Sequence, residues 1–212
     1  MKPRLTSDLS VRQGLLRIVD AQAEQIARLL PQPHPHPSAI HATRLACKRL
    51  RACWRLLEPV LGSQVVAFEN QRLRDAARNL AMQRDVHVAE LTLLDLTANT
   101  SDPDIRKTLE RSHFFLFVQR RHQQSSATQA AHALTYAVMA VNASALNLHR
   151  AALPHTGRDL LAPGLIRQWN KARQLGVLAR TQGRVADFHA WRTAVKRLAY
   201  QLELLYRMDV SH

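Results

Sequence analysis

The sequence predicts an all-α protein, a bundle of long helices, from three observations. Residues that favour helices, such as Ala, Leu, Arg and Gln, recur throughout the 212 residues, whereas six Gly and nine Pro are few for a protein rich in turns. Apolar residues return at helical spacing in nearly every segment. A ten-residue segment, His41–Leu50, recurs as His189–Leu198 with seven identical residues at an offset of 148. Such self-similarity indicates a duplicated helical unit.

The first half of the chain divides at clear breaks. An amphipathic pattern over 9–30 predicts the first helix, which ends at the prolines of Pro31–Pro37, because each residue before a proline is disfavoured in the α region. Ser38 can cap a second helix, and Gly62 is expected to stop it. A turn is expected at Asn99–Pro103. The predicted helices of this half span 9–30, 38–61, 65–96 and 104–133.

The second half continues with helical patterns and further breaks. Pro154–Gly157, Pro163–Gly164 and the surroundings of Gly183 interrupt the pattern, since proline and glycine commonly mark turns. The predicted helices span 134–152, 165–179 and 185–208. We therefore expect one domain over 1–212, with a first repeat at about 8–133 and a second at about 134–212, related by a pseudo-twofold axis.

The charge balance favours a polyanionic partner. Thirty Lys and Arg stand against 16 Asp and Glu, a net charge of +14, and 25 of the basic residues are Arg. The planar guanidinium suits phosphate oxygens better than the point charge of Lys does. Between Arg111 and Ala186 the only acidic residue is Asp159, whereas a merely solvated surface usually mixes both signs. A phosphate polyanion is the leading partner class, and a basic protein without a dedicated anion site is the alternative.

The repeated segments place their basic residues on one helix face. At 100° per residue, five residues from His41 to Arg55 form a stripe about 80° wide, and apolar residues that include Leu50 and Trp54 lie opposite. No carboxylate occurs between His41 and Leu57, so like charges within the stripe repel one another. The second copy repeats the arrangement, with Trp191, Ala194, Leu198, Leu202 and Leu205 on the apolar face. A bound polyanion would relieve the repulsion on both helices.

At these residues the sequence resembles the CHAD family, the conserved histidine α-helical domains. The family motif runs approximately His-x-x-Arg-x-x-x-Arg/Lys-Arg-Leu-Arg in two copies. The first copy here fits at every position, whereas in the second Ala199 stands where the pattern expects Arg. The resemblance covers nearly the whole chain and implies helices around a basic cavity or groove that binds inorganic polyphosphate.

The third predicted helix also resembles the family. Its segment Leu80-Ala-Met-Gln-Arg84-Asp85-Val-His87-Val88 follows a basic stretch that contains Arg74 and Arg78. Arg84 and Asp85 are expected to form a local pair of mainly structural value. Together, the stripes, this helix and the resemblance predict a polyphosphate-binding site of His41, Arg44, Lys48, Arg49, Arg51, Arg55, Arg74, Arg78, His189, Arg192, Lys196, Arg197 and Tyr200.

The resemblance implies further helices after the second motif, yet the sequence stops at His212. We therefore expect a shortened member or a trimmed chain, in which the second repeat lacks its last helices. The basic cavity is then open on one side or closed by a second chain, so a homo-oligomer is one alternative.

Other chemistry lacks support in the sequence. There is no Gly-Lys-Ser/Thr phosphate loop, Gly-rich dinucleotide turn or Gly-x-Ser-x-Gly elbow, and His34 and His36 have no Cys, Asp or Glu among them to complete a metal site. We expect no catalytic residue, no metal, no cofactor and no enzymatic activity. No apolar run reaches the length of a membrane span. Cys47 and Cys53 point apart on one helix and cannot form a disulfide with each other, so we expect a cytoplasmic protein.

Two functions remain from these observations. The first is non-catalytic binding of inorganic polyphosphate, with attachment to polyphosphate granules. The alternative is a nucleic-acid-binding protein that uses the same basic surface on a sugar-phosphate backbone. Phe114, Phe115 and Phe117 could suggest stacking on bases, but they do not alternate with the basic stripes, so core packing is expected for them.

Overall fold

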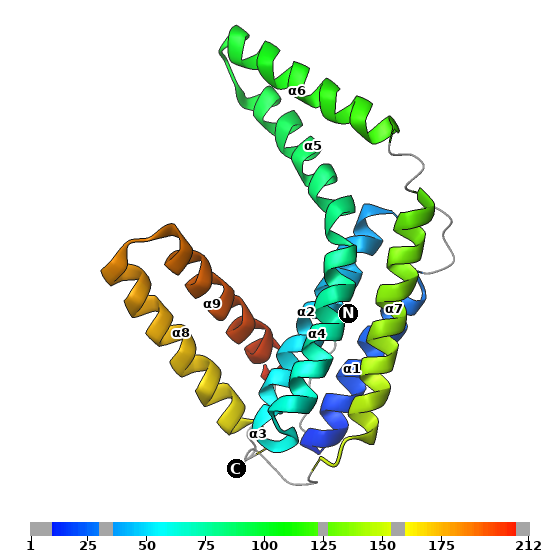
Figure 1. Cartoon of the computed structure of the whole chain (residues 1–212), viewed down its shortest axis with the longest axis vertical. Helices are drawn as coiled ribbons and strands as arrows, with labels where there is room; N and C mark the ends of the chain where they lie inside the picture. The colour runs from blue at the N-terminus through cyan, green and yellow to red at the C-terminus, as the bar shows by residue number, and fades with distance from the viewer. Residues whose placement is uncertain (1–9, 30–35, 123–126, 154–159, 207–212) are drawn as a thin grey trace.

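The computed structural model describes residues 10–29, 36–122, 127–153 and 160–206, without the side chains of 81–88, 119–122 and 127–129. Every regular element in these ranges is a helix (Figure 1), which confirms the predicted all-α class. None of the helices in these ranges is long and apolar enough to cross a membrane.

Four helices form the core bundle: α1 (Val11–Ala27), α2 (Pro37–Leu56), α4 (Ser63–Asn79) and α7 (Ala127–Arg150). Their apolar faces meet in one cluster, in which Leu15, Leu50, Leu73 and Val138 are at most 1% exposed. Helix α7 belongs largely to the predicted second repeat, yet it packs against α1, α2 and α4. The division into two repeats at 133/134 and their pseudo-twofold relation stay predictions.

Two helical hairpins extend from this core on different sides (Figure 1). One consists of α5 (Ala81–Asn99) and α6 (Pro103–His122), and the other of α8 (Ala162–Gln182) and α9 (Val185–Leu205). The expected turn at Asn99–Pro103 joins the first pair. Gly183, in the left-handed region with φ 66°, ends α8 and joins the second, as the sequence indicated.

Several predicted boundaries were wrong. The segment 65–96 is two helices, α4 and α5, separated at Leu80, and α6 ends at His122 rather than continuing to 133. Helix α2 begins one residue earlier than expected, because Pro37 occupies its first turn and the His36 ring accepts a hydrogen bond from the Ser38 amide. It ends at Leu56, before the short helix α3 (Glu58–Leu61) that Gly62 terminates. The Arg84–Asp85 pair and most of Pro31–Pro37 lie outside the described residues.

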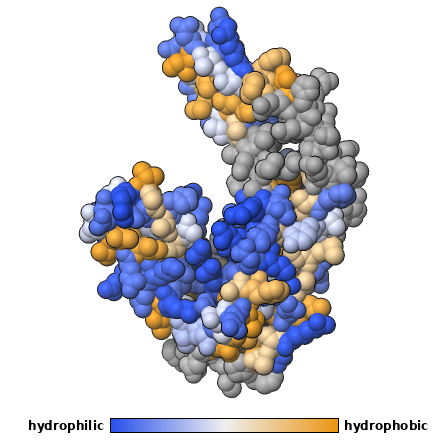
Figure 2. Space-filling model, viewed as in Figure 1, coloured by the Kyte–Doolittle hydropathy of each residue, from blue (hydrophilic) through white to orange (hydrophobic). Residues whose placement is uncertain are grey.

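Two apolar predictions were also wrong. Phe114, Phe115 and Phe117 do not pack in the core but lie exposed on α6, because the only helix that α6 packs against closely in the described chain is α5. Leu202 lies exposed on α9. Figure 2 shows hydrophobic residues on both hairpins, and hydrophilic residues where the α8–α9 hairpin faces the core.

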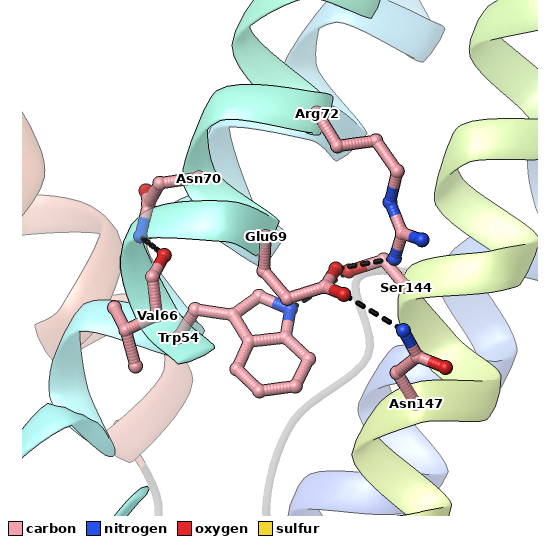
Figure 3. A network of polar contacts seen from close by, with 7 residues as sticks. All are labelled: Trp54, Val66, Glu69, Asn70, Arg72, Ser144 and Asn147. Carbon is pink, nitrogen blue, oxygen red and sulfur yellow. Dashed lines mark hydrogen bonds and ion pairs between the residues drawn. The ribbon is translucent and has the colours of Figure 1, made fainter. Parts of the chain in front are cut away.

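A buried polar network fixes the rotation of α2 in the bundle (Figure 3). The Trp54 indole N–H donates to the Ser144 hydroxyl on α7 at 2.7 Å. Beside it, the buried Glu69 carboxylate pairs with Arg72 and accepts from the Asn147 amide at 2.8 Å. Because buried polar groups are costly without partners, the Trp54 bond opposes rotation of α2, and the Glu69 contacts hold α4 against α7. The basic face of α2 is thereby turned away from the core.

Contacts with α2 and the segment that follows it hold the α8–α9 hairpin in place. Gly164 lies so close to α2 that a Cβ there would be 2.0 Å from the Leu56 carbonyl oxygen. The buried Gln201 amide donates to the Ala52 carbonyl at 3.3 Å, and Arg167 forms a 2.7 Å ion pair with Glu58. These contacts bring the second motif copy, on α9, alongside the first, on α2.

Candidate functional site

The two motif copies face a common pocket of about 220 Å³ between α2 and α9. Three basic residues of α2 and three of α9 line it, together with a histidine and a tyrosine of α9. The lining residues are Lys48, Arg51, Ala52 and Arg55 from α2, and His189, Arg192, Thr193, Lys196, Arg197 and Tyr200 from α9. We call this the basic pocket. Its lining includes no carboxylate, so its charge is strongly positive.

The surroundings of the basic pocket destabilise the charged form of two of its arginines. Burial lowers the pKa of Arg51 to about 10, and the positive charges of Arg55, Arg197 and Arg74 act in the same direction. Burial also lowers the pKa of Arg197, with smaller contributions from Arg55 and Arg74. A lowered pKa of a base means that its charged form is destabilised by its surroundings. An anion in the pocket would offset this destabilisation.

The hydrogen bonds of these arginines leave capacity for a ligand. The Arg55 Nε donates to the Asn70 side-chain oxygen at 3.2 Å, and the Asn70 amide donates in turn to the Val66 carbonyl at 2.8 Å. This orients one edge of the Arg55 guanidinium. The Arg51 Nε is buried and makes no hydrogen bond within the described residues, and a buried donor without a partner is unfavourable.

Eight of the 13 predicted site residues line the basic pocket, and five do not. Arg74 lies on α4, exposed but close enough for its charge to act on Arg51 and Arg197. Arg78 is exposed on α4, and His41 is exposed near the start of α2. Arg44 donates from Nη1 to the Ala77 carbonyl at 2.7 Å, which ties α2 to α4.

Arg49 is directed to a different partner. Its guanidinium forms a 2.7 Å ion pair with Glu203 of α9, and its side chain is 14% exposed. On the helical wheel Arg49 lies outside the stripe that contains Lys48, Arg51 and Arg55. Its contact therefore joins the two helices beside the pocket, and it does not line the pocket itself.

Sequence reasoning missed two lining residues and the residues that position α9. Thr193 lies one turn after His189 and donates its hydroxyl to the His189 carbonyl at 2.9 Å, and Ala52 leaves room between the flanking arginines. Helical spacing from the motif could have found both. Gln201 and Glu203 carry no such signal, because their partners Ala52 and Arg49 are about 150 residues away in the chain.

The described residues offer no evident metal site. No three His, Cys, Asp or Glu side chains come together among them as metal ligands would. Cys47 and Cys53 are buried and free, and burial raises the pKa of both thiols to about 12. They are therefore protonated and unreactive at neutral pH.

The fold and the pocket define an all-α protein with a strongly basic pocket between two helices that carry copies of the same sequence motif. Residues 17–208 match the family model of the CHAD domain, and the chain belongs to the CHAD family. CHAD domains are associated in general with polyphosphate binding. No curated protein and no solved structure matches the chain.

Proposed function

We propose that this protein binds inorganic polyphosphate, without catalysis, in the basic pocket between α2 and α9. The observation that carries the proposal is the convergence of six Lys and Arg side chains on a pocket whose lining contains no carboxylate. Guanidinium groups form charge-assisted, often bidentate bonds with phosphate oxygens, and a chain of phosphates can contact several of them in succession.

The size of the pocket favours a thin polyanion over a nucleic acid duplex. Its volume of about 220 Å³ corresponds to roughly seven water volumes, enough for a few phosphate groups of an extended chain. A duplex can lie only across the pocket mouth. The lining also lacks the Asp and Glu side chains that would hold Mg²⁺ against a phosphate, so the proposed role is binding. Such binding would attach the protein to polyphosphate granules.

The salt dependence of affinity is expected to be steep. If the six cations replace six counterions, the affinity for polyphosphate should fall roughly a thousandfold between 50 and 200 mM salt, by analogy with DNA. Fluorescence anisotropy with end-labelled long-chain polyphosphate measures this. A log–log slope near −1 would mean that one cation or fewer contacts phosphate, which contradicts the proposal.

A competition experiment separates the two polyanions. Unlabelled polyphosphate, single-stranded DNA and double-stranded DNA, at equal phosphate concentration and near physiological salt, compete for the protein against labelled polyphosphate. We expect polyphosphate to displace the label at the lowest concentration and duplex DNA at the highest. Displacement by either DNA at a lower concentration than polyphosphate would instead support a nucleic-acid-binding role.

A further inference from the structure

The α5–α6 hairpin exposes large apolar side chains that nothing covers in the described chain, and four of them lie together on one side. Helix α5 packs against α6, and Leu93 of α5 and Leu116 of α6 are partly buried, which assigns them to the inner side of the hairpin. Roughly 100° to 160° around each helix from these two residues, and on the same side of the antiparallel pair, four side chains are between 46% and 67% exposed. This set, which we call the α5–α6 face, consists of Leu91, Leu94, Phe114 and Phe117.

The α8–α9 hairpin carries a second apolar side. Ala172 of α8 packs inside the hairpin against Ala194 and Leu198 of α9. A quarter-turn from this seam, on the side away from the basic pocket, six side chains are between 42% and 58% exposed. This α8–α9 face consists of Ile166, Trp169 and Val177 from α8, and Phe188, Val195 and Leu202 from α9.

Aromatic contacts support this assignment of sides. Trp191 lies against Gly176, where an added Cβ would be 2.9 Å from the indole Nε1. The Trp191 ring also contacts the Phe188 ring, with centroids 6.3 Å apart. The indole therefore bridges the two helices next to Phe188, and the exposed residues of α8 and α9 form one continuous surface. Contiguous apolar surfaces of this kind usually mark an interaction site.

The two hairpins have opposite net charges. The described side chains of 89–118 include five acidic and three basic residues, a net charge of −2. Those of 160–206 include two acidic and eight basic residues, a net charge of +6. An α5–α6 hairpin therefore attracts an α8–α9 hairpin, whereas two hairpins of the same kind repel each other. The attraction between unlike hairpins works against the overall repulsion between two copies, because each copy has a net charge of +14 that opposes non-specific self-association.

We propose that two copies of this chain form a dimer in which the α5–α6 face of each copy packs on the α8–α9 face of the other. Each contact would be a four-helix arrangement built from two hairpins, and twofold symmetry would produce it twice. Within one copy the hairpins extend from different sides of the core (Figure 1) and have no extensive contact between their described residues. The contacts of Gly164, Gln201 and Arg167 hold the α8–α9 hairpin in this position.

The apolar surface is large enough for a stable dimer. An aromatic side chain has about 150–250 Å² to bury, and the ten side chains of the two faces are roughly half exposed. Each contact can then remove on the order of 1,000 Å² from water, and both contacts about 2,000 Å², within the range of specific interfaces.

The proposal does not depend on polyphosphate binding, and its test is made without any polyanion that could bridge two copies.

Sedimentation equilibrium or light scattering after gel filtration measures the mass directly. At tens of micromolar and moderate salt we expect about twice the mass of one chain. Two double variants, Leu94→Glu with Phe114→Glu and Trp169→Glu with Val195→Glu, should each have the mass of one chain. Met139→Glu, at a 64% exposed position of α7 outside both faces, should remain dimeric. If the wild-type protein has the mass of one chain, the proposal is wrong. This outcome includes a monomer in which the two hairpins of the same chain pack on each other.

Mixing the two double variants tests the pairing rule. In a mixed dimer one contact joins two altered faces, but the other joins an intact α5–α6 face to an intact α8–α9 face. Equimolar mixing should therefore restore association with about tenfold or more lower affinity than wild type, while neither variant associates alone. If wild type dimerises but the mixture remains at the mass of one chain even at tenfold higher concentration, pairing between unlike hairpins is wrong. Circular dichroism checks that every variant retains its helices.

Discussion

Replacing Arg51 and Arg197 together with methionine should weaken polyphosphate binding about a hundredfold, while the unliganded protein becomes more stable. A hydrogen bond to a charged group contributes about 1.5–3 kcal/mol, so two lost guanidiniums correspond to about 3 kcal/mol in binding. In the free protein these arginines are partly buried among like charges, which is why their pKa values are lowered. Methionine keeps much of the apolar stem and removes the charge.

The stability gain has a defined sign and pH range. Because the pKa of Arg51 in the folded state is lowered to about 10, its charge destabilises the fold wherever the group is protonated in both states. That range lies below about pH 10; above it the destabilisation declines, and it is gone only when the pH exceeds the ordinary pKa of arginine. After allowance for screening by solvent, we expect a gain of about 1 kcal/mol in the free energy of unfolding at neutral pH, or about 2–4 °C in Tm.

A matched control separates the pocket from net charge. Arg111 and Arg150 are exposed on α6 and α7 and do not line the basic pocket. Their replacement with methionine removes the same charge and should lower affinity only a few-fold, with little change in Tm. Titration calorimetry and thermal unfolding measure both quantities. Equal losses of affinity in the two double variants, or a lower Tm for the pocket variant, would contradict the assigned role of Arg51 and Arg197.

The second large effect is expected from Gly164→Ala. A methyl group there would lie 2.0 Å from the Leu56 carbonyl oxygen and 2.7 Å from its carbonyl carbon, and backbone atoms of a packed helix cannot move aside cheaply. Helix α8 must therefore shift away from α2. We expect a destabilisation of about 3 kcal/mol, at the upper end for overpacking. Displacement of α8 also moves α9, so polyphosphate affinity should fall at least tenfold.

Gly176→Ala provides the comparison for this prediction. At Gly176 the added methyl group meets the side chain of Trp191 rather than backbone, and a partly exposed ring can adjust more easily than backbone can. The change should cost less than about 1 kcal/mol, because alanine also raises helix propensity by nearly that amount. Denaturant unfolding of both variants measures the difference. A Gly164→Ala protein as stable as wild type would show that α8 does not need this close approach to α2.

Local patterns predicted the parts of the structure that depend on helix geometry alone. Helical spacing placed Lys48, Arg51 and Arg55 on one side of α2 and Leu50 and Trp54 on the other, and the structure has them so. The break between α4 and α5 at Leu80 could not be predicted in this way, because no glycine or proline lies near it in the sequence. The exposure of Phe114 could not be foreseen either, since the sequence does not show that α6 packs closely with α5 alone.

The arrangement of the site depends on contacts between distant residues. That α9 lies against α2 follows from Gly164, from the buried Gln201 amide and from the Arg49–Glu203 pair. Each of these contacts joins segments more than 100 residues apart, so no periodicity within one helix could reveal it. For the same reason the repeated motif grouped Arg49 with Lys48, although Arg49 joins α9 beside the basic pocket.

Protection of lysines from chemical labelling tests most directly whether polyphosphate binds in the basic pocket. Lys48 and Lys196 line the pocket, whereas Lys107 on α6 and Lys171 midway along α8 do not, so one sample contains both the site and its controls. Acetylation rates with and without long-chain polyphosphate are read by mass spectrometry. We predict at least fivefold slower labelling of Lys48 and Lys196, with Lys107 and Lys171 nearly unchanged. Equal protection of all four lysines, or selective protection of Lys107 and Lys171, would contradict the assignment.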